Sequence, residues 1–124
     1  MYVNLPEVEV CIRESDVLSE IADRADRVME EKSLYLNPNL TLEQLAREVW
    51  SNRTYVSRAL RLRRGVSFRE YVCRFRMQYA RKLGNRMGYG RSDLAVRCGF
   101  NSVRAFNRAA YDFLSEMKSG FSDL

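Results

Sequence analysis

Apolar residues recur three and four positions apart along much of the chain, which is the spacing of the buried face of an amphipathic helix. The pattern predicts an all-α protein of about six to seven helices. Two long stretches show it best. Their apolar positions are Val17, Leu18, Ile21, Ala25, Val28 and Met29 in the first stretch, and Phe68, Tyr71, Val72, Phe75, Tyr79 and Leu83 in the second.

Residues 40–71 predict two short helices joined by a tight corner. Thr41 and Gln44 fit a capping box, in which each side chain bonds to the backbone amide of the other residue, so the first helix begins there. Asn52 is the expected N-cap of the second helix, which should end before Gly65.

The second helix of this segment has two contrasting faces. One face is mostly apolar and should look into a core, and its members are Tyr55, Val56, Ala59 and Leu60. The opposite face carries hydrogen-bond donors at helical spacing, which are Thr54, Ser57, Arg58 and Arg61. A small polar face with arginine, on a helix supported by another helix, is what the major groove of DNA accepts.

Farther along, the chain repeats this arrangement after a long helix and a glycine-rich loop. The motif that starts at Leu94 matches the one at Leu45, and the motif at Phe106 matches the one at Val56. Such self-similarity predicts a duplicated supersecondary unit. Its second helix should expose Arg104, Asn107, Arg108 and Tyr111, and it should bury Val103, Phe106, Ala110 and Phe113.

These patterns predict two helix-turn-helix subdomains joined by a long linker helix. We expect an irregular N-terminal leader over residues 1–14, a first subdomain over 15–66, the linker helix over 67–84, and a second, partly degenerate subdomain over 85–124. The first long helix is rich in acidic residues. Because those residues would repel phosphate, we expect its acidic face to point away from DNA.

Charge is divided unevenly along the chain. Residues 1–50 carry 5 basic and 11 acidic side chains, whereas residues 51–124 carry 16 basic and 5 acidic ones, within a net charge of +5. The C-terminal part should therefore be attracted to polyanions. A solvated basic surface without a ligand is the alternative, since a basic stripe alone is not proof of binding.

Composition argues against several other classes of protein. The chain has no histidine, and its three cysteines, Cys11, Cys73 and Cys98, form no CxxC pair, so a structural zinc site or a disulfide framework is not expected. No motif or carboxylate pair indicates catalysis, so we expect no enzyme, no cofactor and no small-molecule site. No run of about 18 apolar residues indicates a membrane span, and we expect a cytoplasmic protein.

These residues resemble the DNA-binding domain of AraC/XylS-type transcription regulators. The resemblance covers about residues 22–113 and is strongest in the runs TLEQLA, NRTYVSRAL, RGVSFREYV and RMQYARKL, with LAxxCGFNS and FNR in the second unit. It implies a sequence-specific regulator that binds double-stranded DNA, with RNA polymerase as a candidate partner. The chain departs from the family pattern at Arg91 and Ala110, where the family has an aliphatic residue and an aromatic one. It also lacks the family's C-terminal proline motif, so we expect a less stable second unit with weaker or lost DNA contact.

The resemblance also implies site residues, and their chemistry supports it. Arginine can donate two hydrogen bonds to guanine, asparagine can pair with adenine, and serine or threonine can bond to either partner. The expected base contacts are Thr54, Ser57 and Arg58 in the first unit and Arg104, Asn107 and Arg108 in the second. Arg53, Arg61 and Arg64 are expected at phosphates. The competing hypothesis is a basic helical module that binds an acidic protein partner.

Overall fold

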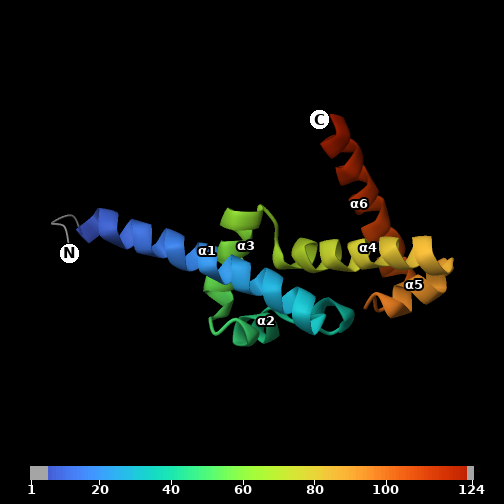
Figure 1. The fold of residues 1–124 in the computed structure, drawn as a ribbon, viewed down its shortest axis with the longest axis horizontal. Helices are drawn as coiled ribbons and strands as arrows, with labels where there is room; N and C mark the ends of the chain where they lie inside the picture. Colours follow the sequence, from blue (N-terminus) through green and yellow to red (C-terminus); the bar gives the residue numbers. More distant parts are fainter. Residues whose placement is uncertain (1–5, 123–124) are drawn as a thin grey trace. The chain divides into compact units, whose positions relative to one another are not determined.

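The computed structural model of the chain describes residues 6–122, which form six α-helices, one short 3-10 helix and no strand. The all-α prediction is therefore confirmed. The elements in order are α1 (Pro6–Lys32), η1 (Leu34–Leu36), α2 (Leu42–Glu48), α3 (Arg53–Arg64), α4 (Phe68–Met87), α5 (Arg91–Arg97) and α6 (Val103–Ser122) (Figure 1).

The helices form two compact units. The first contains the described residues up to Lys32 together with Leu40–Phe68, and the second contains Ser33–Asn39 and the described residues from Arg69 onward. The short segment around η1 thus follows α1 in the sequence but packs in the second unit. This division differs from the predicted one, which kept the segment with the first subdomain.

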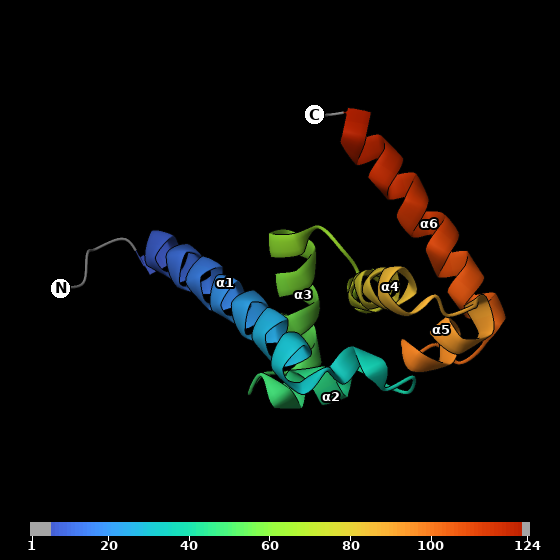
Figure 2. The ribbon, with the colours of Figure 1, turned by 45° about the vertical axis from the view of Figure 1, so that its right-hand side comes forward.

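In the first unit, α1 crosses α3, and α2 lies next to both helices (Figure 2). The apolar stripes predicted from the sequence supply the core. Its fully or almost fully buried side chains are Leu18, Ile21, Ala22, Ala25, Met29, Leu45, Ala46, Val49, Val56, Ala59, Leu60 and Val66. Small residues on α1 and on α3 allow the two helices to approach closely, because alanine adds little bulk between the backbones.

The predicted helix ends of the first unit are confirmed. The Thr41 hydroxyl accepts a hydrogen bond from the Gln44 amide, and the Gln44 side chain accepts one from the Thr41 amide. The Asn52 carboxamide oxygen accepts a hydrogen bond from the Tyr55 amide at 2.9 Å. Gly65 ends α3 in the left-handed conformation, with φ of 68°. These caps satisfy amide and carbonyl groups that a short helix leaves open.

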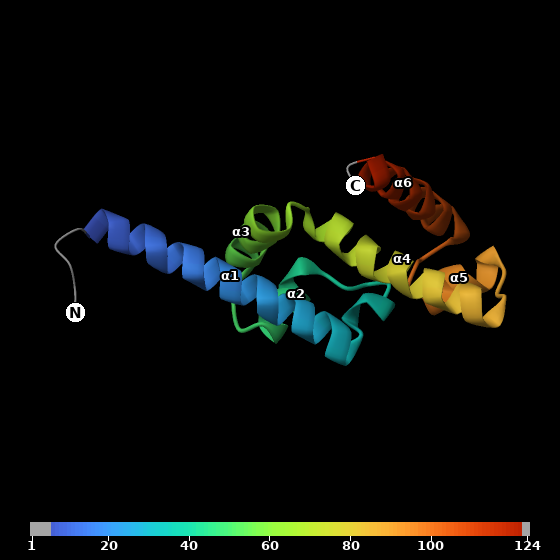
Figure 3. The same cartoon turned by 45° about the horizontal axis from the view of Figure 1, so that its top comes forward.

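The second unit is built from η1, α4, α5 and α6, with α5 beside the C-terminal part of α4 (Figure 3). Its buried core consists of Met77, Ala80, Ala95, Cys98, Phe100, Phe106 and Ala109. The rings of Phe100 and Phe106 meet edge to face, with 5.5 Å between centroids. Such aromatic pairs contribute beyond the apolar area that they bury.

Three sequence-based expectations need correction. Residues 6–14 are helical, so the expected irregular leader is wrong for them, while residues 1–5 lie outside the described part of the chain. The long helix continues past Gly84 to Met87, four residues beyond its predicted last apolar position. Tyr55 and Val103 were expected to face a core but are 41% and 37% exposed, because each lies at the margin of its helix's apolar stripe.

Candidate nucleic-acid interface

The predicted donor face of α3 is exposed. Thr54, Ser57, Arg58 and Arg61 all lie at the surface, whereas Val56, Ala59 and Leu60 on the other side of the helix are fully buried. A helix held rigidly from behind keeps its outward side chains in a defined arrangement, which recognition of base edges requires. We call these four residues the first donor face.

Arg58, the central arginine of the first donor face, has a carboxylate partner. Its guanidinium forms an ion pair with Glu14 of α1, and the Arg58 side chain is 49% exposed. Next to this pair, Arg63 donates hydrogen bonds to the hydroxyl and the backbone carbonyl of Ser15. Glu14, which was expected in the irregular leader, is thus a residue of α1 that reaches the first donor face.

Arg64 has a structural role that sequence analysis missed. Its guanidinium donates to Asp26 at 2.7 and 3.0 Å and to Asp23 at 2.9 Å, so it ties the end of α3 to α1. The hydrogen bond to Asp26 is the main cause that raises the pKa of Arg64. Since two carboxylates already occupy this guanidinium, the geometry favours a structural role for Arg64 over the predicted phosphate contact. Arg53, another predicted phosphate contact, is exposed and lies 3.4 Å from a Glu43 carboxylate oxygen.

The corresponding face of α6 in the second unit is also exposed. Arg104, Asn107 and Arg108 all lie at the surface, opposite the buried Phe106 and Ala109. The carboxamide oxygen of Asn107 accepts a hydrogen bond from Arg91, the first residue of α5, at 2.9 Å. We call Arg91, Arg104, Asn107 and Arg108 the second donor face. Within the described part of the chain, no carboxylate forms an ion pair with its three arginines.

The corner before α6 is anchored by Arg76 of α4. Its guanidinium donates to the carbonyl oxygens of Tyr35 at 2.7 Å and Asn37 at 2.9 Å, and it lies 5.6 Å from the centre of the Phe100 ring. Burial lowers the pKa of this guanidinium. The segment around η1 is thus held close to Gly99, where a Cβ atom would come within 2.4 Å of the Tyr35 carbonyl oxygen.

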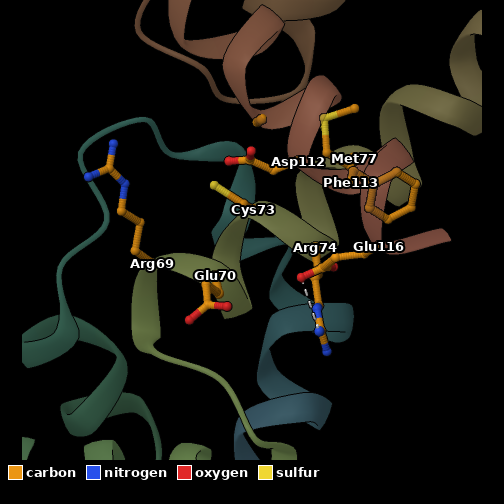
Figure 4. Close-up of a pocket in the computed structure, with 9 residues that line it drawn as sticks. Arg69, Glu70, Cys73, Arg74, Met77, Asp112, Phe113 and Glu116 are labelled. Carbon is orange, nitrogen blue, oxygen red and sulfur yellow. Dashed lines mark ion pairs between the residues drawn. The ribbon is translucent and has the colours of Figure 1, made fainter. Parts of the chain in front are cut away.

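A cavity lies between α4 and α6 of the second unit. It has a volume of about 130 Å³, and its lining includes Cys73, Asp112 and the Arg74–Glu116 ion pair, whose nearest atoms are 3.5 Å apart (Figure 4). Burial raises the pKa of the Cys73 thiol, which disfavours the reactive thiolate. Among the residues that the structure describes, no cluster of three or more metal-ligating side chains occurs.

Sequence reasoning identified the exposed donor positions on both helices but not their partners. Glu14 and Arg91 are far in sequence from the residues that they contact, by 44 positions for Arg58 and 16 for Asn107. A periodic pattern within one helix carries no information on such contacts. Arg91 in place of an aliphatic residue is a departure visible in the sequence, but by itself it predicts only weaker packing of the second unit.

Comparison with known proteins agrees with this geometry. A family model described as a helix-turn-helix domain matches residues 27–122. Among solved structures, the chain is similar to the C-terminal domain of the two-component response regulator yesN from Fusobacterium nucleatum. The TM-score is 0.63 at 22% sequence identity, with 74% of this chain and 93% of that chain covered. No curated protein matches the chain. No helix within residues 6–122 is long and apolar enough to cross a membrane.

Because the solved structure is only 22% identical in sequence, it supports the fold alone. Membership of the family follows from the family model, which matches residues 27–122. The predicted resemblance is therefore confirmed. The chain belongs to the AraC-type helix-turn-helix family and is a DNA-binding domain that acts in transcription regulation.

Proposed function

We propose that the chain recognises a specific sequence in double-stranded DNA by inserting α3, and independently α6, into the major groove. The observation that carries this proposal is the first donor face, which is exposed on a helix whose other side is fully buried. A major groove about 12 Å wide admits one α-helix and presents a distinct pattern of donors and acceptors for each base pair.

Within this proposal each side chain has a role set by its chemistry. Arg58 would donate two hydrogen bonds to guanine O6 and N7 after leaving Glu14, while Thr54 and Ser57 would contact neighbouring bases. Arg53 and Arg61, which are exposed near the two ends of the face, would neutralise phosphates and fix the register of the helix on the duplex.

Selection of binding sites from random duplex DNA tests the proposal directly. The parent protein should enrich a motif, and Arg58→Ala should lose about 1–3 kcal/mol of binding free energy and relax the preference at one base pair. Arg61→Ala should instead weaken binding to all sequences alike and reduce the salt slope by about one. Arg27→Ala, which removes the same charge from an exposed position on α1, is the matched control.

The test also separates the competing hypothesis. If the parent protein shifts no duplex at low or moderate salt, the proposal is wrong, and an acidic protein partner becomes the better explanation of the basic surface. If a motif is enriched but Arg58→Ala binds it as tightly as the parent does, DNA binding stands and the assignment of the first donor face is wrong.

A further inference from the structure

The hydrogen bond between Arg91 and Asn107 joins α5 and α6 within the second donor face. Arg91 begins α5, Asn107 lies in the second turn of α6, and both side chains are exposed. An exposed hydrogen bond between two surface side chains contributes little to stability, because water can replace either partner. The pair therefore has no evident role in holding the fold together.

The surroundings of the pair are cationic. Arg104 and Arg108 lie three residues before and one residue after Asn107, on the same exposed side of α6. None of the three arginines of the second donor face forms an ion pair with a carboxylate of the described residues. A polyanionic ligand would meet these charges without first displacing an acidic side chain, in contrast to Arg58 in the first unit.

The direction of the hydrogen bond decides what the pair can recognise. A free asparagine reads adenine because its carbonyl oxygen accepts from the adenine amino group while its amide nitrogen donates to N7. In this structure Arg91 donates to the Asn107 carbonyl oxygen at 2.9 Å. This bond takes one of the two lone pairs of the oxygen and leaves both donors of the amide NH₂, next to a guanidinium with further N–H donors.

A surface whose donors outnumber its one remaining acceptor position, and which carries positive charge, suits an edge with two acceptors. Guanine presents O6 and N7 in the major groove, whereas adenine presents one acceptor and one amino donor, which the guanidinium would oppose. We propose that Arg91 and Asn107 act together as one base-reading element that selects guanine over adenine. The inference rests on the proposed function and names Arg91 as a specificity-determining residue outside the recognition helix.

The experiment is selection from random duplex DNA by the full chain and by two variants, Asn107→Ala and Arg91→Ala. In Asn107→Ala the base preference at one position of the motif should disappear, and this loss identifies the position that the pair reads. The parent should select guanine at that position. Arg91→Ala should select adenine, because the carbonyl oxygen of Asn107 is free again, and it should bind the parent's site about tenfold more weakly. Circular dichroism should show that both variants keep the parent's helix content.

A charge-matched control is available in the same helix. Arg97 lies in the last turn of α5, with its guanidinium 4.3 Å from the centre of the Tyr89 ring. Arg97→Ala removes the same charge as Arg91→Ala without touching Asn107, so it should leave the guanine preference unchanged.

Other outcomes would overturn the inference in distinct ways. If Arg91→Ala weakens all sites alike and keeps guanine, Arg91 contacts phosphate and does not share in base recognition. If Asn107→Ala alters no position while Arg58→Ala alters one, the Arg91–Asn107 pair reads no base, but the proposed function stands. If the parent enriches no motif at all, the inference and the proposed function fall together.

Discussion

The corners of the two helix-turn-helix motifs have the same backbone but different side chains where it turns left-handed. The amide of Ser51 donates to the carbonyl of Ala46 in the first corner, and the amide of Phe100 donates to the carbonyl of Ala95 in the second, both at 2.9 Å. The residue before each amide has a positive φ, which is 59° for Trp50 and 87° for Gly99.

The difference follows from what lies nearby. The backbone of η1 approaches Gly99 so closely that any Cβ would collide with it. Glycine is therefore required there both by this close approach and by the positive φ. Trp50 is 88% exposed, so its corner tolerates a bulky side chain, although a left-handed conformation costs a non-glycine residue about 1–2 kcal/mol. Glycine at the second corner is therefore dictated by a neighbouring segment, whereas at the first corner only the backbone conformation favours it.

The two donor faces also differ, in whether their arginines are paired with carboxylates. In the first unit, the central arginine is paired with a carboxylate from α1. In the second unit, which was expected to have weaker contact with DNA, the arginines have no such partner among the described residues. Four predictions test these comparisons.

The largest effect is expected for Gly99→Ala. A Cβ atom there would lie 2.4 Å from the Tyr35 carbonyl oxygen, and the conformation is strained for alanine as well. We expect a loss of about 3 kcal/mol or more in the free energy of unfolding of the second unit, measured by urea denaturation. Gly88 also has a positive φ, but nothing lies within 4 Å of its Cβ position. Gly88→Ala should therefore cost only about 1–2 kcal/mol. Equal losses for both variants would argue against the close approach of η1.

The second prediction concerns Cys98, which occupies the position of Val49 in the first unit. Burial raises the pKa of the Cys98 thiol from 9.0 to about 11. The unfolded chain releases this proton near the ordinary pKa, but the folded chain retains it. Stability from this group is therefore complete below about pH 9 and is lost progressively as the pH rises through about 11.

Urea denaturation of the parent and of Cys98→Val between about pH 8 and pH 11 measures this dependence. The variant carries the residue found in the first unit and should lose less stability over that range. Parallel curves for the two proteins would contradict the prediction, since the other titratable groups, among them the Cys73 thiol, would then account for all of the alkaline effect.

The third prediction is a gain in stability for Trp50→Gly. Glycine removes the strain of the left-handed conformation, and its greater freedom in the unfolded chain offsets part of the gain. We expect an increase of about 0.5–1 kcal/mol in the free energy of unfolding. Because Trp50 is the single tryptophan, circular dichroism should follow the transition. Trp50→Ala keeps the strain and should be nearly neutral, so a gain of equal size in that variant would assign the effect to the exposed ring.

The smallest effect is expected for Glu14→Gln. Removing the carboxylate that competes for Arg58 should strengthen DNA binding about twofold to fivefold, the range for an exposed ion pair. Glu20→Gln removes the same charge from an exposed position on α1 and should change affinity less. In an Arg58→Ala background, Glu14→Gln should give no gain, as a double-mutant cycle would show. An equal gain with and without Arg58 would indicate long-range repulsion instead.

Much of the fold could be predicted because its signals are local. The capping box at Thr41, the N-cap at Asn52 and the left-handed Gly65 depend on a few neighbouring residues, and the apolar stripes depend on helical periodicity. The same periodicity identified the exposed donor side chains of α3 and α6, but it wrongly placed Tyr55 and Val103 in a core. The helical start of α1 was missed because glutamate and valine alternate over residues 7–10, which is not a helical period.

The contacts that modify the candidate interface could not be predicted from local patterns. Arg58, Arg64 and Asn107 are bonded to residues on other helices, and only the folded chain brings those partners together. An exposed arginine is the same in the sequence whether it pairs with a carboxylate or remains available for DNA. The distinction matters for function, because the first state opposes binding and the second favours it.

The hydrogen bonds from Arg76 to the segment around η1 have a practical consequence for dissecting the molecule. A fragment that begins at Arg69 would lack the carbonyl oxygens of Tyr35 and Asn37, and with them the partners of the half-buried Arg76 guanidinium. A fragment that ends at Phe68 would retain that segment with nothing of its own unit to pack against. A single cut therefore cannot yield two self-sufficient halves, and an expression plasmid for the C-terminal half alone would need residues 33–39 grafted back.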